Sequence, residues 1–374
     1  MNRERVGKQL GTALLFAALS LFCGLGSAAG QKIIDMPPPP PLPTPKPTPT
    51  PAPPKDDDFE VIKVSSNLVM VPVSVVDAQG AAVRGLQVSD FRLEEEGREQ
   101  QITEIGNPDE VPLDIAILFD VSSSVSQKGF FAFQQNAAAS FLKQVLKPVD
   151  RAAVFTISDT PKLFSPLAPA DVAAAKILSI PAATSPVPTA FYDTVMAASK
   201  YLVENSAERH RRVVLVISDG DDNFSSLVKD LTVAEYRASQ KGDVTKAAAH
   251  ENLLARRQRA VVEVQKSVQQ ADAAFYSINP GGPSIHLNEI STRAQNAMDS
   301  IAQSTGGSAY VPEAERDLAR VFGEIAAELR GQYLVQYYSN SKEPSAQFRR
   351  IAVKVSTRPD LRVRARQGYY PKAK

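Results

Sequence analysis

Residues 113–126 read LDIAILFDVSSSVS and set the fold of this chain. The run 115–119 is apolar at every position and ends abruptly in Asp120. A short run of this kind is typical of a central strand that helices cover on both faces. In such sheets the ligand site lies beyond the carboxyl ends of the strands. We therefore expect Asp120, Ser122 and Ser124, in the spacing Asp-x-Ser-x-Ser, to lie at a ligand site.

The chemistry of these three side chains indicates a metal ion. One carboxylate and two hydroxyls are hard oxygen donors that carry little charge. Such a set suits Mg²⁺ or Ca²⁺, and it suits neither zinc nor copper.

Two later segments repeat the geometry. The run 212–218, RVVLVIS, has the pattern of a second buried strand and is followed by Asp219. Thr189 precedes a helical pattern that begins at Phe191, so it is a loop hydroxyl at a helix start. Three loops therefore bring oxygen donors to one edge of the predicted sheet.

Together these residues resemble the von Willebrand factor A domain and its metal-ion-dependent adhesion site. The family pattern is Asp-x-Ser-x-Ser, then a Thr, then an Asp after a later strand; its members here are Asp120, Ser122, Ser124, Thr189 and Asp219. The resemblance covers roughly residues 111–331. It implies a doubly wound, mostly parallel α/β sheet. It also implies that the hydroxyls bind Mg²⁺ directly, that the two carboxylates hold it through water, and that a partner's carboxylate completes the octahedron.

The overall composition excludes some functions. The chain has 374 residues, with 42 basic and 41 acidic side chains. This balance gives no electrostatic footprint for nucleic acid. Cys23 is the one cysteine, so a chain that loses its leader needs no disulfide in an oxidising compartment.

Residues 1–30 have the pattern of an export signal, with a basic start, an apolar core and small residues near the end. We expect cleavage without lipid; an uncleaved membrane anchor and lipidation at Cys23 are the alternatives. The protein is then exported and is periplasmic, secreted or on the cell surface. Residues 31–58 are predicted to be a disordered linker, because proline at the density of 37–54 favours polyproline II and leaves no packed core. A ligand for a proline-binding domain is the other interpretation of that segment.

The two flanks of the central domain, 59–110 and 332–374, alternate apolar and polar residues as half-buried strands do. We expect them to pair into one small β-sandwich. Their order also resembles a bacterial exported family related to von Willebrand A domains. Residues 94–96, three glutamates, are predicted to face water at a turn. A stripe of three arginines is predicted to be a solvated strand face, with an acidic partner as the alternative: Arg362, Arg364 and Arg366.

The central domain, 111–331, alternates strand and helix patterns, which indicates a mostly parallel sheet. Helices are expected over these ranges: 127–146, 171–180, 190–204, 292–304 and 314–331. Residues 227–271 are longer than the resemblance requires and have a helical composition. They are predicted to be an inserted helix or helical hairpin, which either shapes the ligand surface or is a solvated decoration.

Several acids near the predicted site have an alternative interpretation as structural groups. Aspartate and serine are favoured before helices, so capping is the alternative for Asp120 and Asp219. Asp193 either orients the site or interacts with the positive end of a helix dipole. Asp221 and Asp222 are expected to be solvent-facing loop acids rather than part of the metal shell.

The predicted function is a non-enzymatic, metal-dependent protein-binding or adhesion module. Its metal is Mg²⁺, with Mn²⁺ and Ca²⁺ as alternatives, and its partner is a protein that offers an Asp or Glu carboxylate. A phosphate-ester hydrolase is one alternative, although such enzymes carry an acid where this chain has Ser122. A scaffold with a degenerate metal site is another. A serine hydrolase needs a base near its nucleophile, and the chain offers only His210, His250 and His286.

Overall fold

The structure is a computed structural model, and it describes residues 68–122, 131–185, 187–242, 246–281, 289–341 and 347–371. The predicted export signal and proline-rich linker lie outside the described residues. Ser124 also lies outside them. The part of the chain from Val64 onwards forms one compact unit.

The centre of this unit is a six-stranded sheet in the order β10-β9-β8-β5-β6-β7. All neighbouring pairs are parallel except β6 and β7, which are antiparallel. Its strands are β5 (Leu113–Asp120), β6 (Arg151–Ile157), β7 (Lys162–Ala168), β8 (Arg211–Ile217), β9 (Ala273–Ile278) and β10 (Ala309–Tyr310). The predicted doubly wound, mostly parallel sheet is therefore confirmed.

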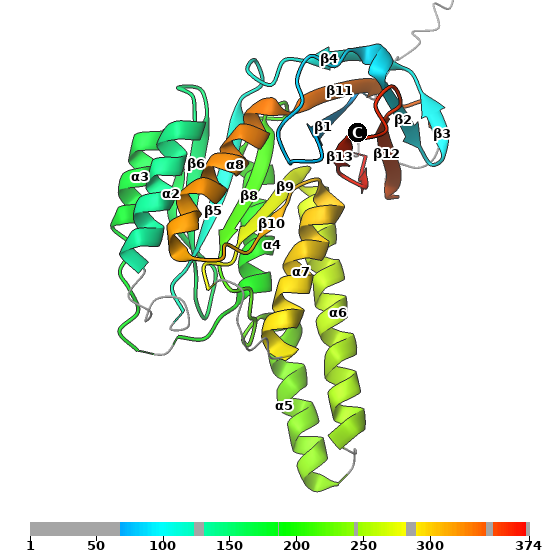
Figure 1. Cartoon of the computed structure of the whole chain (residues 1–374). Coiled ribbons are helices and arrows are strands. Elements are labelled where there is room, and N and C mark those ends of the chain that lie inside the picture. Colours follow the sequence, from blue (N-terminus) through cyan, green and yellow to red (C-terminus); the bar gives the residue numbers. More distant parts are fainter. Residues whose placement is uncertain are drawn as a thin grey trace, which may run out of the picture. The chain divides into compact units, whose positions relative to one another are not determined.

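Helices cover both faces of the sheet, as the uniformly apolar β5 requires. All eight residues of β5 are buried. Ile115 and Ile117 pack into a core with α2, α3 and α8, whereas Ala116 and Leu118 pack into a second core with α4, α6 and α7. Figure 1 shows these two sets of helices on opposite sides of the strands. Because side chains alternate along a strand, both faces of β5 must be apolar.

The helices agree with the predicted ranges to within a few residues. Their bounds are α2 (Phe131–Val145), α3 (Ala170–Leu178), α4 (Phe191–Asn205), α5 (Ser226–Lys241), α6 (Lys246–Gln270), α7 (Glu289–Thr305) and α8 (Leu318–Gly331). Short 3-10 turns are η1 (Val88–Asp90) and η2 (Glu315–Asp317). Among the described residues, no helix is both long and apolar enough to cross a membrane.

The order of the strands reverses at β5. The chain passes from β5 to β6 on one side and then returns to β8 on the other side. Ligands of open α/β sheets bind at such a reversal, beyond the carboxyl ends of the strands. Asp120 ends β5, and Asp219 follows β8, so both lie at this edge.

The two flanks form a β-sandwich, as predicted. One sheet has the order β13-β1-β11-β4 and the other has the order β14-β12-β2-β3. The N-terminal flank supplies β1 (Leu68–Val76), β2 (Phe91–Glu95), β3 (Arg98–Gln100) and β4 (Ile102–Gly106). The C-terminal flank supplies β11 (Tyr333–Tyr338), β12 (Arg349–Val355), β13 (Arg362–Ala365) and β14 (Gly368–Tyr369). Alternate valines of β1, Val69 to Val75, point into the core that the two sheets enclose.

The prediction that all three glutamates of 94–96 face water is wrong for Glu95. Its side chain is buried and accepts hydrogen bonds from the hydroxyls of Tyr337 (2.7 Å) and Ser339 (2.8 Å). Arg349 lies 3.4 Å from the same carboxylate. Alternation along β2 puts Glu95 on the inner face of the sandwich, where polar partners from the C-terminal flank satisfy it.

The prediction of a solvated arginine stripe is also wrong for two of its three members. Arg364 pairs with the buried Glu328 of α8 at 2.7 Å. Arg366 is buried, pairs with Asp272 and donates to the carbonyl of Met70 at 2.8 Å. Only Arg362 of the stripe is exposed. The stripe therefore joins the sandwich to the central domain and leaves no row of arginines for an acidic partner.

Helices α5 and α6 pack against each other and fill most of the segment predicted to be an insertion (Figure 1). The second half of α6 belongs to the central core, where Val261, Val264 and Val268 are buried against α4 and α7. That half of α6 therefore acts as one of the covering helices of the sheet.

Candidate metal centre

Asp120 is the most buried acid of the site. Its side chain is fully buried at the end of β5. One carboxylate oxygen accepts the backbone N–H of Ser122 at 2.7 Å, and the other accepts the hydroxyl of Ser218 at 2.6 Å. These bonds fix the carboxylate at the edge of the sheet.

The electrostatic surroundings of Asp120 are unfavourable for a lone carboxylate. Burial, followed by repulsion from Asp219, raises the pKa of Asp120 to about 6. Hydrogen bonds from Ser218 and Ser122 oppose this rise without cancelling it. Two carboxylates therefore lie close together in a poorly solvated place, an arrangement that a cation stabilises.

The loop after β8 turns sharply behind Asp219. Gly220 has a positive φ of 76°, a conformation that side-chain-bearing residues rarely adopt. Its N–H donates to the hydroxyl of Ser218 at 2.9 Å. Ser218 therefore connects Asp120 to the turn that carries Asp219.

Thr189 is held against this same loop. It is buried, and its N–H donates to the side-chain oxygen of Asn223 at 3.0 Å. Its carbonyl accepts the N–H groups of Asn223 and Phe224, both at 3.1 Å. The structure therefore gathers Asp120, Ser122, Thr189 and Asp219 at one edge of the sheet, while Ser124 lies outside the described residues.

The expectation that Asp222 is a solvent-facing acid is wrong. Its carboxylate is buried and accepts the N–H of Tyr192 at 2.7 Å, in the first turn of α4. It also accepts hydrogen bonds from the N–H of Ser225 at 2.9 Å and from the Ser225 hydroxyl at 2.5 Å. Burial raises the pKa of Asp222 despite these bonds. Asp222 therefore caps α4 and closes the loop, as a structural residue of the site.

The carboxylate of Asp193 contacts the first residue of α5. It accepts the N–H and the hydroxyl of Ser226, each at 2.8 Å. Because Asp193 itself lies in the first turn of α4, its carboxylate links the start of that helix to the start of α5.

Sequence reasoning missed two arginines beside the site, Arg257 of α6 and Arg293 of α7. Arg257 donates to the carbonyl of Asp222 at 2.9 Å. Burial and then Asp219 raise the pKa of Asp221, and both arginines act against that rise. No sequence motif marks either residue, because each reaches the site only through the packing of its helix.

The charges at this edge do not balance. The charged side chains that lie close to one another at this edge are those of Asp120, Asp219, Asp221, Asp222, Arg257 and Arg293. Four carboxylates against two guanidinium groups leave two negative charges when all are ionised. A divalent cation would neutralise that excess. The donors of carboxylate and hydroxyl type also fit Mg²⁺.

The described residues contain no group of three or more His, Cys, Asp or Glu side chains placed to hold a metal ion. This agrees with a site in which three of the five proposed donors are hydroxyl groups, those of Ser122, Ser124 and Thr189. It also argues against a zinc centre built from His and Cys among those residues.

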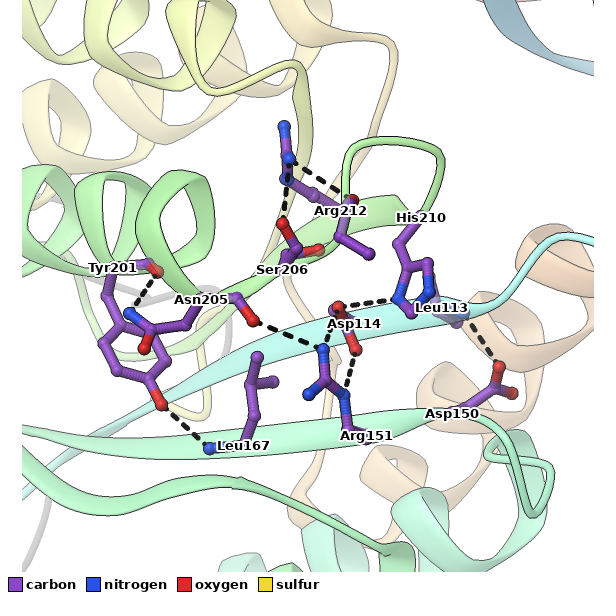
Figure 2. A network of polar contacts seen from close by, with 11 residues as sticks. Leu113, Asp114, Asp150, Arg151, Leu167, Tyr201, Asn205, Ser206, His210 and Arg212 are labelled. Atoms are coloured by element: carbon purple, nitrogen blue, oxygen red, sulfur yellow. Dashed lines mark hydrogen bonds and ion pairs between the residues drawn. The ribbon is translucent and has the colours of Figure 1, made fainter. Parts of the chain in front are cut away.

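A separate polar network lies at the opposite end of β5, around Asp114 (Figure 2). Asp114 is fully buried, pairs with Arg151 at 2.8 Å and lies 2.9 Å from Nδ1 of His210. Asp114 and Asp120 are six positions apart along β5, which is about 20 Å at the usual rise per residue. His210 therefore serves the opposite edge of the sheet from Asp120.

No protein-family model matches the sequence, and no curated protein matches it either. Solved structures do match. One is proximal thread matrix protein 1 from the mussel byssus, with zinc in its MIDAS motif (14% identity, TM-score 0.40, 62% of this chain and 48% of that chain). A second is the vWF domain of the pilus tip protein Mfa5 from Porphyromonas gingivalis (13% identity, TM-score 0.40, 58% of this chain and 94% of that chain).

A third is a von Willebrand factor type A protein from Catenulispora acidiphila (12% identity, TM-score 0.41, 72% of this chain and 51% of that chain). The match spans about half the length of the mussel protein, at 48%. Two of these neighbours carry the name of the von Willebrand A domain, which is the family that the sequence resembles. Since all three TM-scores lie below 0.5, the function of this chain has to be argued from its own side chains.

Proposed function

We propose that this protein binds a divalent cation at Asp120, Ser122, Ser124, Thr189 and Asp219 and uses it to bind a carboxylate of a partner protein. The observation that supports this most is the pair of neighbouring carboxylates at the switch point of the sheet, Asp120 and Asp219, of which Asp120 is fully buried and Asp219 is half-buried. Asp219 repels Asp120. A cation at this edge would relieve that repulsion.

Each residue of the proposed site has a distinct task. The hydroxyls of Ser122, Ser124 and Thr189 would bind the metal, and the carboxylates of Asp120 and Asp219 would supply charge through water. Both Asp120 oxygens already accept a hydrogen bond from the protein, which suits indirect contact. The bound metal would supply a positive charge and a vacant position for a Glu or Asp of the partner.

The small number of carboxylates favours Mg²⁺ or Mn²⁺ over Ca²⁺. Protein sites for Ca²⁺ use six to eight oxygens and commonly several carboxylates, whereas Mg²⁺ keeps water ligands and needs one or two carboxylates. Asp222 is unavailable as a further ligand, because its carboxylate is engaged by Tyr192 and Ser225.

Binding is favoured over hydrolysis by the position of the described bases. A hydrolase needs a general acid or base near the reacting atoms. His210 is at the far edge of the sheet and is paired with Asp114. His250 and His286 have no described side chains. The residue two positions after Asp120 is Ser122, which is a poor proton donor.

The N-terminal segments suit a module displayed outside the cytoplasm. An export signal over 1–30 would direct the chain out of the cell, and the proline-rich linker over 31–58 would hold the binding domain away from its anchor or neighbour. Adhesion to an exported or surface protein is the role that fits these parts.

The partner half of the proposal can be tested with a peptide that carries one glutamate and a matched peptide that carries glutamine. Mn²⁺ affinity of the full chain is measured by electron paramagnetic resonance with either peptide present. We expect the glutamate peptide to tighten Mn²⁺ binding and the glutamine peptide to leave it unchanged. Equal Mn²⁺ affinity with both peptides would contradict a partner carboxylate on the metal.

A further inference from the structure

We propose that Arg257 of α6 is a positioning residue for the metal site and that it fixes Thr189 through a single peptide group. This inference rests on the proposed function and extends it to helix α6, in the segment that the sequence predicts either to shape the ligand surface or to be a solvated decoration. The evidence is the packing of α6 and a chain of two hydrogen bonds that runs from Arg257 to Thr189.

Helix α6 is held in place just beyond Arg257. One turn beyond Arg257, Ala260 and Val261 enter the central core. Further along, Gln265 donates to the hydroxyl of Ser300 in α7 at 2.6 Å. Arg257 therefore extends from a part of α6 that cannot move without disturbing the core.

The first hydrogen bond joins Arg257 to the loop after β8. One guanidinium nitrogen donates to the carbonyl of Asp222 at 2.9 Å. That carbonyl belongs to the same peptide group as the N–H of Asn223. In the second hydrogen bond, the Asn223 N–H donates to the carbonyl of Thr189 at 3.1 Å. Hydrogen bonds on both sides of one peptide group polarise and strengthen each other.

The Asp222 side chain extends the same link to α4. It caps that helix through the N–H of Tyr192. Loss of the Arg257 contact would therefore loosen the loop that carries Asp219 and, with it, the segment that carries Thr189. Groups that orient metal ligands in this way affect metal affinity by about 10- to 100-fold when they are removed.

The sign of the effect separates positioning from simple electrostatics. Arg257 is a positive charge near a proposed cation, so removal of its charge alone would tighten metal binding. Removal of its hydrogen bond to the Asp222 carbonyl would weaken metal binding. Arg293 provides the comparison, because it also acts on Asp221 and makes no hydrogen bond to the loop among the described residues.

The test compares Arg257→Ala with Arg293→Ala in the full chain. We expect Arg257→Ala to weaken Mn²⁺ binding about tenfold, Arg257→Lys to restore part of the affinity, and Arg293→Ala to tighten binding. Arg259→Ala, on the exposed side of α6, should bind Mn²⁺ as the wild type does. Mn²⁺ affinity for Arg257→Ala equal to or above that of the wild type would overturn the inference.

Amide hydrogen exchange in the metal-free protein gives a second readout. The N–H groups of Asn223 and Phe224 should exchange faster in Arg257→Ala than in the wild type and at the wild-type rate in Arg293→Ala. If the wild-type protein bound no Mn²⁺, the proposed function would fail while the exchange rates still decided whether Arg257 holds the loop. Unchanged exchange in Arg257→Ala would overturn the inference in either case.

Discussion

At the scale of single residues, the sequence identifies the candidate metal-binding side chains better than it identifies the side chains that hold them in position. Asp120 can be placed from sequence because an acid that ends an apolar strand must lie at the edge of the sheet. The role of Asp222 cannot be placed in this way. Its capping of Tyr192 depends on a loop and a helix that meet only after folding. The same is true of Arg257, which reaches the site from a distant helix.

Asp222 gives a direct test of that structural role. Asp222→Ala should lower the free energy of unfolding by about 2–3 kcal/mol, because the Tyr192 N–H and the Ser225 hydroxyl lose their buried acceptor. Urea unfolding measures the change. Asp171→Ala is the matched control, since Asp171 lies in the first turn of α3 and is exposed. A loss no larger than that of the control would contradict the capping role.

The ionisation of Asp114, at the other edge of the sheet, should make the stability of the fold depend on pH. Burial alone would raise the pKa of Asp114, but hydrogen bonds from Arg151 and His210 outweigh it and hold the pKa below the usual 3.8. Because the folded pKa is lowered, this carboxylate stabilises the fold above the unfolded value, and the stabilisation is lost as pH falls through the folded pKa.

Asp114→Asn should therefore destabilise the protein by about 2 kcal/mol at pH 7 and by progressively less below about pH 4. Denaturant unfolding of wild type and variant at pH 7 and pH 3 measures the difference. The same loss at both pH values would exclude the carboxylate charge as its cause.

At the scale of elements, periodicity predicts the central sheet well because each strand buries both faces. The segment 227–271 is harder, since its composition is charged and only part of it is buried. The buried positions Val261, Val264 and Val268 are spaced for one helix face, but charged neighbours conceal them in the sequence. The two polar exceptions in the sandwich, Glu95 and Arg364, cannot be predicted for a different reason, because their partners lie far away in the chain.

The contribution of α6 to the core can be measured with two valines of the same helix. Val264 is fully buried, whereas Val262 is 50% exposed. Val264→Ala should cost about 1–3 kcal/mol of unfolding free energy through lost burial and a cavity, and Val262→Ala should cost less than about 0.5 kcal/mol. Similar losses in both variants would mean that α6 does not pack against the sheet as described.

At the scale of the molecule, a buried carboxylate joins the sandwich to the central domain. Glu328 of α8 accepts the hydroxyls of Ser74 in β1 (2.9 Å) and Tyr276 in β9 (3.0 Å). It also pairs with Arg364 of β13 at 2.7 Å. The sequence predicts both domains, and it does not predict this junction, because its members come from four separate elements.

Because Glu328 contacts both domains, we expect residues 64–374 to unfold in one cooperative transition. Glu328→Ala should lower the unfolding free energy by about 3–5 kcal/mol, since it leaves Arg364 without its partner and empties a buried polar site. Glu324→Ala, which removes an exposed ion pair with Arg320 on the same helix, should cost less than about 1 kcal/mol. Two separate wild-type transitions in calorimetry would contradict the coupling.

The central claim is that the edge of the sheet beside Asp120 binds a divalent cation. Calorimetric titration of Mg²⁺ into the full chain tests it most directly, with Asp120→Ala and Ser122→Ala as comparisons whose fold is checked by circular dichroism. We expect the wild type to bind one Mg²⁺ and both folded variants to bind none or to bind far more weakly. Equal Mg²⁺ binding by the wild type and the two variants would contradict the claim.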